Sequence, residues 1–151
     1  MCLLDQVTRW DETRIFCRAA VPTADHPFAR AEGVPTIVAI EYAAQAAAVH
    51  SMLLDGHIEP HGGMLATLSE VELSGGWLNE TSGALAIDAE LVARDGSGCL
   101  YSFMVHDKHG CRARGRLVVA FTGVPTVPTP ERELAPDWRE ATERQRSPNG
   151  R

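Results

Sequence analysis

The sequence lacks the closely spaced cysteine pairs that most zinc and redox sites require. Its four cysteines are scattered over 151 residues: Cys2, Cys17, Cys99 and Cys111. The missing Cys-x-x-Cys spacing excludes the usual zinc-ribbon and thioredoxin-like motifs, and reduced thiols of a cytosolic protein are the simpler interpretation. His57 and His61 are four residues apart, but Pro60 separates them and no third ligand is near in sequence. We therefore expect no metal site.

Signals for nucleic-acid binding, nucleotide binding and secretion are also missing. The formal net charge of -6 gives no general reason to expect nucleic-acid binding. No P-loop, Rossmann glycine fingerprint or Ser-His-Asp order is present. The opening MCLLDQVTRW has no basic region and reaches an acid at Asp5, so it is a poor signal peptide. We expect a cytoplasmic protein that binds neither nucleic acid nor membrane.

An apolar, alanine-rich stretch from Pro35 to Leu54 predicts one long helix. Proline suits the first helical turn, where its missing N–H costs nothing. The alanines favour helix and keep it thin, and Gly56 supplies a stop. Because Glu41, Gln45 and His50 interrupt the run, a buried helix of a soluble protein fits better than a membrane span.

Alternating segments on both sides of this helix predict an antiparallel sheet. A short hairpin is expected within residues 1–21. Four strands are expected after the helix, at Met64–Leu73, Ala84–Arg94, Cys99–Asp107 and Cys111–Phe121. The turn-forming residues between these four favour three successive hairpins, that is, a meander. A thin helix lets a curved sheet approach closely, so we expect the sheet to wrap around it.

The composition changes after residue 122. The segment GVPTVPTP holds three prolines in eight residues and cannot continue a central strand. The final stretch is charged and poor in apolar anchors. We therefore expect one folded domain over residues 1–122 and a mobile tail over residues 123–151.

Glu41 and Gln45 are the polar pair inside the apolar helix. They are four residues apart and share one helix face. Two interpretations stay open. The face reaches solvent or a subunit interface, or Glu41 is a general acid whose pKa is raised by its apolar setting.

His26 precedes the helix by a loop long enough to fold back over the helix start. A lone loop histidine is usually polar surface. Paired with Glu41, however, it supplies the one base and one acid that an elimination needs. Backbone N–H groups near Thr36 and Ile37 are candidates to polarise a substrate carbonyl, because they belong to the helix N-terminus.

Arg112, Arg114 and Arg116 alternate along the last predicted strand. A solvated outer face is the simpler interpretation. The alternative is a docking patch for an acidic carrier protein or a phosphate-bearing cofactor arm.

These motifs resemble the hotdog-fold 3-hydroxyacyl-[acyl-carrier-protein] dehydratases over about residues 1–121. The opening MCLLDQVTRWDETRI is similar to the first hairpin of that family, and His26-Pro27-Phe28 looks like a reworked form of its histidine-phenylalanine-proline loop. Pro35 matches the proline that opens the central helix, and Glu41-Tyr-Ala-Ala-Gln45 matches the acid–glutamine signature. The phrase IEYAAQAAAVH is most similar to the small dehydratases of aryl polyene gene clusters.

The resemblance implies an α+β hotdog fold, with the antiparallel sheet wrapped around one long central helix. It also implies a homodimer, or a heterodimer with another hotdog subunit, in which His26 of one subunit faces Glu41 of the other. The family's glycines around the histidine loop are absent here, and Thr36 replaces a further glycine after the helix-opening proline.

The activity implied by the resemblance is dehydration of a 3-hydroxyacyl thioester, on acyl carrier protein or CoA, to the trans-2-enoyl thioester in fatty-acid or polyene-type biosynthesis. His26 would take the C2 proton, and Glu41 would protonate the departing 3-hydroxyl. The N–H groups near Thr36 and Ile37 would stabilise the enolate-like oxygen, while Gln45 would orient Glu41. No metal or redox cofactor is needed, because the acyl group arrives on a phosphopantetheine arm.

Two alternatives fit the same residues. A hotdog acyl thioesterase also places a carboxylate on the central helix but uses it to activate water; the histidine before the helix favours dehydration instead. A catalytically weak partner subunit would complete a heteromeric dehydratase, a reading motivated by the altered loop around His26.

Overall fold

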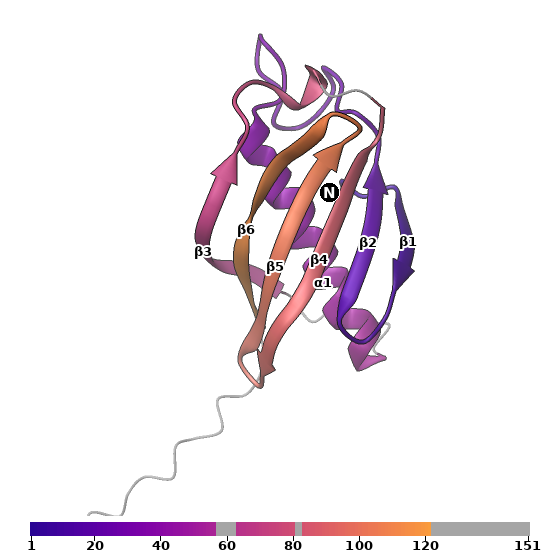
Figure 1. Ribbon diagram of the computed structural model, residues 1–151, viewed down its shortest axis with the longest axis vertical. Coiled ribbons are helices and arrows are strands. Elements are labelled where there is room, and N and C mark those ends of the chain that lie inside the picture. The colour runs from indigo at the N-terminus through magenta and orange to yellow at the C-terminus, as the bar shows by residue number, and fades with distance from the viewer. Residues whose placement is uncertain (57–62, 81–82, 122–151) are drawn as a thin grey trace, which may run out of the picture.

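The chain folds into six strands and one long helix, and the computed structural model describes residues 1–56, 63–80 and 83–121. The elements follow in this order (Figure 1): β1 (Gln6–Trp10), β2 (Arg14–Ala19), the 3-10 turn η1 (Thr36–Val38), α1 (Ala39–Asp55), β3 (Gly63–Leu73), the 3-10 turn η2 (Leu78–Glu80), β4 (Leu85–Asp95), β5 (Gly98–Asp107) and β6 (Gly110–Phe121). The predicted helix and strands are confirmed to within a few residues. The expected tail over residues 123–151 lies outside the described residues.

All six strands form one antiparallel sheet in the order β1-β2-β4-β5-β6-β3, and α1 lies along one face of it (Figure 1). The predicted meander is therefore wrong for one strand, because β3 pairs with β6 and not with β4. The residues after β3 cross to the start of the helix and do not form a hairpin that pairs β3 with β4. In this crossing, Leu78 N–H donates to the carbonyl of Val34 at 2.7 Å. Strand alternation is a local property and does not reveal which partner a strand will choose.

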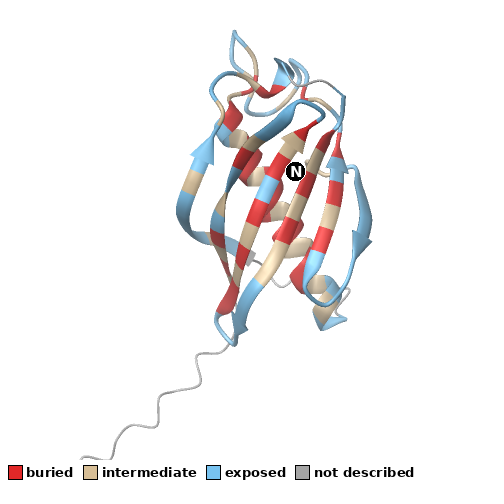
Figure 2. Cartoon of the chain, viewed as in Figure 1, coloured by how far each residue is buried: buried red, intermediate tan, exposed pale blue. Residues whose placement is uncertain are grey.

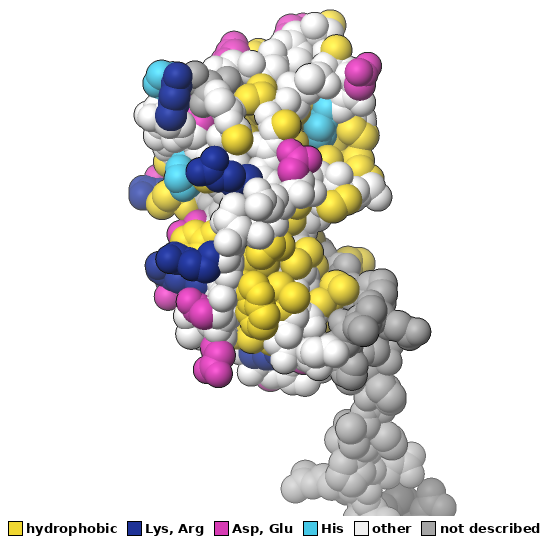
Figure 3. Space-filling model, turned by 90° about the vertical axis from the view of Figure 1, so that its right-hand side faces the viewer, with side chains coloured by type: hydrophobic (Ala, Val, Ile, Leu, Met, Phe, Trp, Pro, Cys, Tyr) yellow, Lys and Arg dark blue, Asp and Glu magenta, His cyan; other side chains and the backbone are white. Residues whose placement is uncertain are grey.

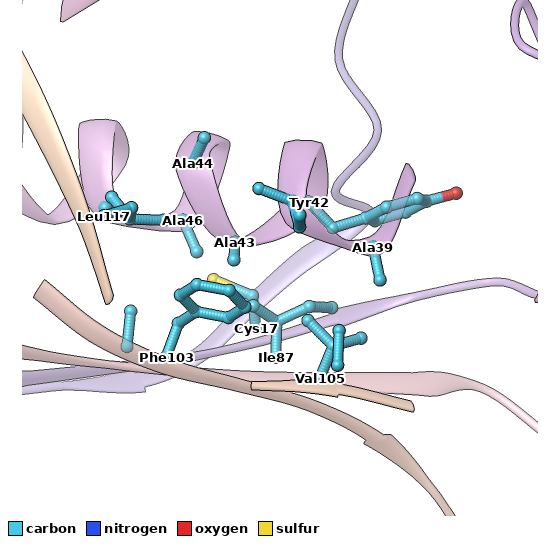
Figure 4. Close-up of a cluster of buried hydrophobic side chains, with 14 of the residues drawn as sticks. Cys17, Ala39, Tyr42, Ala43, Ala44, Ala46, Ile87, Phe103, Val105 and Leu117 are labelled. Carbon is cyan, nitrogen blue, oxygen red and sulfur yellow. The ribbon is translucent and has the colours of Figure 1, made fainter. Parts of the chain in front are cut away.

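The alanines of α1 explain how closely the helix approaches the sheet. Ala39, Ala43 and Ala46 are fully buried and point at the sheet, whereas Ala44 points the other way (Figure 4). Opposite them lie larger buried side chains of the sheet: Cys17, Ile87, Phe103, Val105 and Leu117. Small residues on the helix thus lie against larger ones on the sheet, which lets the two layers pack closely.

Buried residues concentrate on the four inner strands, while the edge strands β1 and β3 are mostly exposed (Figure 2). In the part of the chain that the structure describes, each edge strand pairs with a neighbour on one side only, and such an edge can pair with another chain. The stretch Thr36–Asp55 is long and apolar enough to cross a membrane by length and composition, but half of it is buried inside this fold. That burial agrees with a core helix.

His50 ties the second half of α1 to the sheet. Its side chain is fully buried, with Nδ1 2.9 Å from Tyr101 Oη and Nε2 2.7 Å from the carbonyl oxygen of Asp11. A carbonyl oxygen only accepts, so Nε2 carries the ring proton and Tyr101 donates to Nδ1. Both ring nitrogens are thus satisfied, and His50 has a structural role on the helix face opposite Glu41.

Candidate functional site

A shallow apolar groove opens beside the start of α1. It encloses about 250 Å³ and is lined by Phe28, Ile37, Val38, Ile40, Glu41, Leu65 and Leu68. Three of its walls are large apolar side chains that stay open to solvent, with exposed fractions of 44% for Phe28, 58% for Ile37 and 42% for Leu68. Among the described residues of this lining, Glu41 is the one ionisable group. The groove therefore presents a single carboxyl group to an apolar ligand or partner surface.

Gln45 holds Glu41 and is itself held by the N-terminal segment. Leu3 N–H donates to Gln45 Oε1 at 2.8 Å, so the amide nitrogen of Gln45 must face the other way. That nitrogen donates to Glu41 Oε1 at 3.1 Å and to the carbonyl of Met1 at 3.3 Å. The predicted contact between Gln45 and Glu41 is present. The contribution of Leu3 was not predicted, because nothing in the sequence indicates that the first residues lie over the helix.

His26 contacts Tyr42 and the backbone of its own loop. Its Nε2 lies 3.3 Å from Tyr42 Oη, and its Nδ1 accepts a hydrogen bond from Phe28 N–H at 3.1 Å. The imidazole stacks on the Tyr42 ring, with the ring centroids 6.1 Å apart and an angle of 20° between the planes. Removal of the ring from water lowers the pKa of His26.

Within one chain, His26 and Glu41 form no hydrogen bond or ion pair. Successive residues of an α-helix point about 100° apart. Tyr42 turns toward the core and is 2% exposed, while its neighbour Glu41 turns toward the groove. The expected approach of His26 to Glu41 of another subunit concerns two chains and stays a prediction. Tyr42 was missed as a site residue, although a single tyrosine inside an alanine-rich run is a visible signal.

Thr36 does not offer the free backbone N–H that was expected. Its N–H donates to the carbonyl of Gly76 at 3.3 Å, and its hydroxyl donates to the same oxygen at 2.7 Å. The crossing segment after β3 therefore occupies this group, which corrects the prediction for Thr36. Ile37 keeps its candidate role, because its N–H belongs to the first helical turn, whose N–H groups have no acceptor within the helix.

Two of the three alternating arginines neutralise acids of the neighbouring strand. Arg114 lies 2.7 Å from Glu72, and Arg116 lies 3.3 Å from Glu70. Arg112 instead donates to the carbonyl of Trp77 at 2.9 Å. Seen from the β1 edge, Lys and Arg side chains gather on the outer face of the sheet, at the left of Figure 3, while hydrophobic side chains form a patch nearer the helix. The solvated outer face agrees with these contacts.

Metal ligands do not gather in the described part of the chain, where no group of three or more His, Cys, Asp or Glu residues is arranged to hold an ion. His57 and His61, which are four residues apart in the sequence, lie outside the described residues.

A sheet curled around one long helix, with a carboxylate of that helix opening on an apolar groove, defines a hotdog-fold protein. The structure is similar to the Dehydratase Heterocomplex ApeI:P from Xenorhabdus doucetiae, with a TM-score of 0.69 and 24% identity over 80% of this chain and 83% of that one. It is also similar to a thioesterase enzyme, SAV0944, from Staphylococcus aureus subsp. aureus Mu50, with a TM-score of 0.58 and 15% identity over 78% of this chain and 92% of that one. AziG from S. sahachiroi gives a TM-score of 0.55 and 18% identity over 77% and 89%. These likenesses confirm the predicted hotdog fold.

The sequence itself identifies the family. Residues 1–124 match the ApeP-like family, described as ApeP dehydratase. The chain therefore belongs to the ApeP-like dehydratase family, and the predicted resemblance to the hotdog dehydratases is confirmed. No curated protein matches the chain.

Proposed function

We propose that this chain is a subunit of a dehydratase that converts a 3-hydroxyacyl thioester into the trans-2-enoyl thioester. One observation carries the proposal: the chain belongs to the ApeP-like dehydratase family, and Glu41 is the single ionisable residue among the described residues that line an apolar groove. An apolar groove suits an acyl chain, and a carboxyl group at its wall suits proton transfer to a leaving hydroxyl.

Glu41 is the proposed general acid. Gln45 donates to its Oε1, which leaves Oε2 without a hydrogen bond from the described residues and open to the substrate. In the reaction, a proton acceptor removes the C2 proton, and the electrons of that C–H bond form the C2=C3 double bond. The C3–O bond breaks, and the hydroxyl leaves as water with the proton from Glu41. Ile37 N–H is the proposed donor to the enolate-like oxygen.

Two assignments of the proton acceptor fit the fold. The family resemblance gives this role to His26. The alternative is a residue of a second hotdog subunit, and it is favoured by the hydrogen bonds that occupy both nitrogens of His26. In either case the substrate is proposed to arrive on the phosphopantetheine arm of an acyl carrier protein or CoA, in fatty-acid or polyene-type biosynthesis, without a metal or redox cofactor.

A second hotdog subunit is the proposed partner. Phe28, Ile37 and Leu68 leave apolar surface exposed around the groove, and β3 leaves an open sheet edge beside it. Burial of such a surface against another chain is favourable because it removes apolar area from water and pairs the edge strand. The similar ApeI:P structure is a heterocomplex, so the partner is proposed to be either a second copy or a different hotdog chain.

The proposed function is tested by following enoyl thioester formation from a 3-hydroxyacyl-carrier substrate. The purified chain is assayed alone and with a second hotdog dehydratase subunit. We expect enoyl formation that falls by about 100-fold or more in Glu41→Ala, as for loss of a general acid. Wild-type turnover in both Glu41→Ala and His26→Ala would contradict the proposal.

Two alternative functions are tested by the same assay. A thioesterase would use Glu41 to activate water, and the likeness to the SAV0944 thioesterase favours testing it. Release of free thiol without enoyl product would establish this activity. A supporting subunit without its own catalysis would give activity only with the second hotdog chain, and that activity would survive Glu41→Gln.

A further inference from the structure

The imidazole of His26 is engaged at both nitrogens. Nδ1 accepts from Phe28 N–H at 3.1 Å, and Nε2 lies 3.3 Å from Tyr42 Oη. A backbone N–H can only donate, so Nδ1 must be the unprotonated nitrogen. A neutral imidazole has one donor and one acceptor nitrogen. The ring proton therefore sits on Nε2, which donates to Tyr42 Oη.

This arrangement leaves His26 without a free lone pair. The lone pair of Nδ1 is directed at the backbone of its own loop, and Nε2 carries the proton. To take a proton from a substrate, the ring would have to give up the hydrogen bond from Phe28 and place two N–H groups against each other.

His50 and Tyr101 provide an internal comparison. The chain has two tyrosines, and each hydroxyl meets a histidine. Tyr101 donates to His50 Nδ1, because His50 Nε2 is committed to the Asp11 carbonyl. Tyr42 instead accepts from His26 Nε2. The same pair of side chains is thus used with opposite donor direction at the two sites.

His26 also connects the groove to the helix. Its ring lies 5.8 Å from the ring of Phe28, centroid to centroid, and Phe28 forms a wall of the groove that contains Glu41. The bond to Tyr42 fastens this loop to α1, one residue from Glu41. Loss of the His26 ring would therefore release Phe28 from its place beside the carboxylate.

We propose that His26 is a positioning residue, a hydrogen-bond donor through Nε2 that Tyr42 and the Phe28 amide hold in place, and that it does not take the C2 proton. The inference rests on the proposed dehydration, for which it assigns the role of proton acceptor to a second hotdog subunit.

Nitrogen NMR of the full chain tests the protonation pattern directly and does not depend on activity. In long-range ¹H–¹⁵N spectra of ¹⁵N-histidine protein near neutral pH, we expect His26 to be protonated at Nε2 only. Tyr42→Phe should shift the His26 nitrogen signals, while Tyr101→Phe, the matched loss of a hydroxyl, should shift those of His50 and leave His26 unchanged. A proton on Nδ1, averaging between the two tautomers, or no response to Tyr42→Phe would overturn the inference.

Replacements at His26 separate a donor from a base when the dehydration is measured in the assembled enzyme. Glutamine places an amide nitrogen near the position of Nε2, and asparagine places one near Nδ1. We expect His26→Gln to recover most of the activity lost in His26→Ala, mainly through KM, and His26→Asn to recover little. If His26 were the base, all three variants would lose about 100-fold or more in kcat, and this result would overturn the inference. Full activity in all three variants would also overturn it. Absence of dehydration in the wild type would refute the proposed function and leave the NMR result standing.

Discussion

At the scale of single residues, the central feature is the contrast between Glu41 and Tyr42. They are adjacent in the chain, yet one lines an open groove and the other is 2% exposed. Each is held by a different side chain. Gln45, one helical turn further along α1, donates to Glu41, and His26, from the loop before the helix, contacts Tyr42. The start of the helix therefore presents two chemically different faces within a single turn.

The lowered pKa of His26 leads to a prediction about stability and pH. Because burial lowers its pKa from an ordinary value of 6.5 in the folded chain, the unfolded chain binds the proton first as pH falls. The free energy of unfolding should therefore decrease as pH falls through about 6.5 and level off below the folded pKa.

Urea unfolding of wild type and His26→Gln at about pH 7.5 and about pH 5.5 checks this prediction. The loss of stability on acidification should be smaller in the variant. The exposed His109→Gln serves as the control and should keep the wild-type response. An equal loss in wild type and His26→Gln would show that His26 does not contribute.

At the scale of secondary-structure elements, β3 is held against β6 by an unusually close approach of backbones. A Cβ at Gly115 of β6 would lie 3.0 Å from Val71 Cα and 3.1 Å from Ser69 O. The register of the two strands shifts between Ser69 and Glu72, and Glu70 in between has a φ of 52°. The bulge in β3 brings its backbone close to Gly115, where there is no side chain in the way. A Cβ at Gly115 would meet the backbone atoms Val71 Cα and Ser69 O, which have little room to move.

Gly115→Ala should therefore destabilise the fold by about 1–3 kcal/mol, as overpacking of a tight site does. Gly96→Ala is the matched control, because a Cβ there meets nothing within 4 Å, and its effect should stay within about 0.5 kcal/mol. Denaturant midpoints of the two variants measure the difference. Equal stability of both would contradict the close approach of β3 to β6.

The sequence predicted the helix and the strands, but it did not predict which distant segments each of them contacts. The alanine-rich run predicted the helix, and alternation predicted the strands, because both patterns depend on neighbouring residues. The pairing of β3 with β6 and the occupation of Thr36 N–H by Gly76 depend on where the chain crosses in space. Glu41 and Gln45 were found by their helical spacing, but the bond between His26 and Tyr42 required the path of the loop.

At the scale of the whole molecule, the exposed apolar side chains around the groove point to assembly. Leu68 lies on the edge strand β3, lines the groove and is 42% exposed. If this surface is the proposed interface, Leu68→Lys should weaken the assembly by placing a charge in a buried contact. Val92→Lys is the control, because Val92 is 50% exposed on β4 and away from the groove.

Light scattering after size-exclusion chromatography measures the assembly. We expect wild type and Val92→Lys to form the same complex, with itself or with a second hotdog subunit, and Leu68→Lys to shift toward the monomer. An unchanged mass for Leu68→Lys would place the interface elsewhere on the molecule.

The most direct test of the account is the product formed from a 3-hydroxyacyl thioester carried on acyl carrier protein, measured for wild type and Glu41→Gln in the same assembly. Glutamine keeps the size of the side chain and removes the transferable proton. The account predicts trans-2-enoyl thioester with the wild type and a loss of about 100-fold or more with Glu41→Gln. Equal enoyl formation by the two proteins, or release of free thiol in place of the enoyl product, would contradict it.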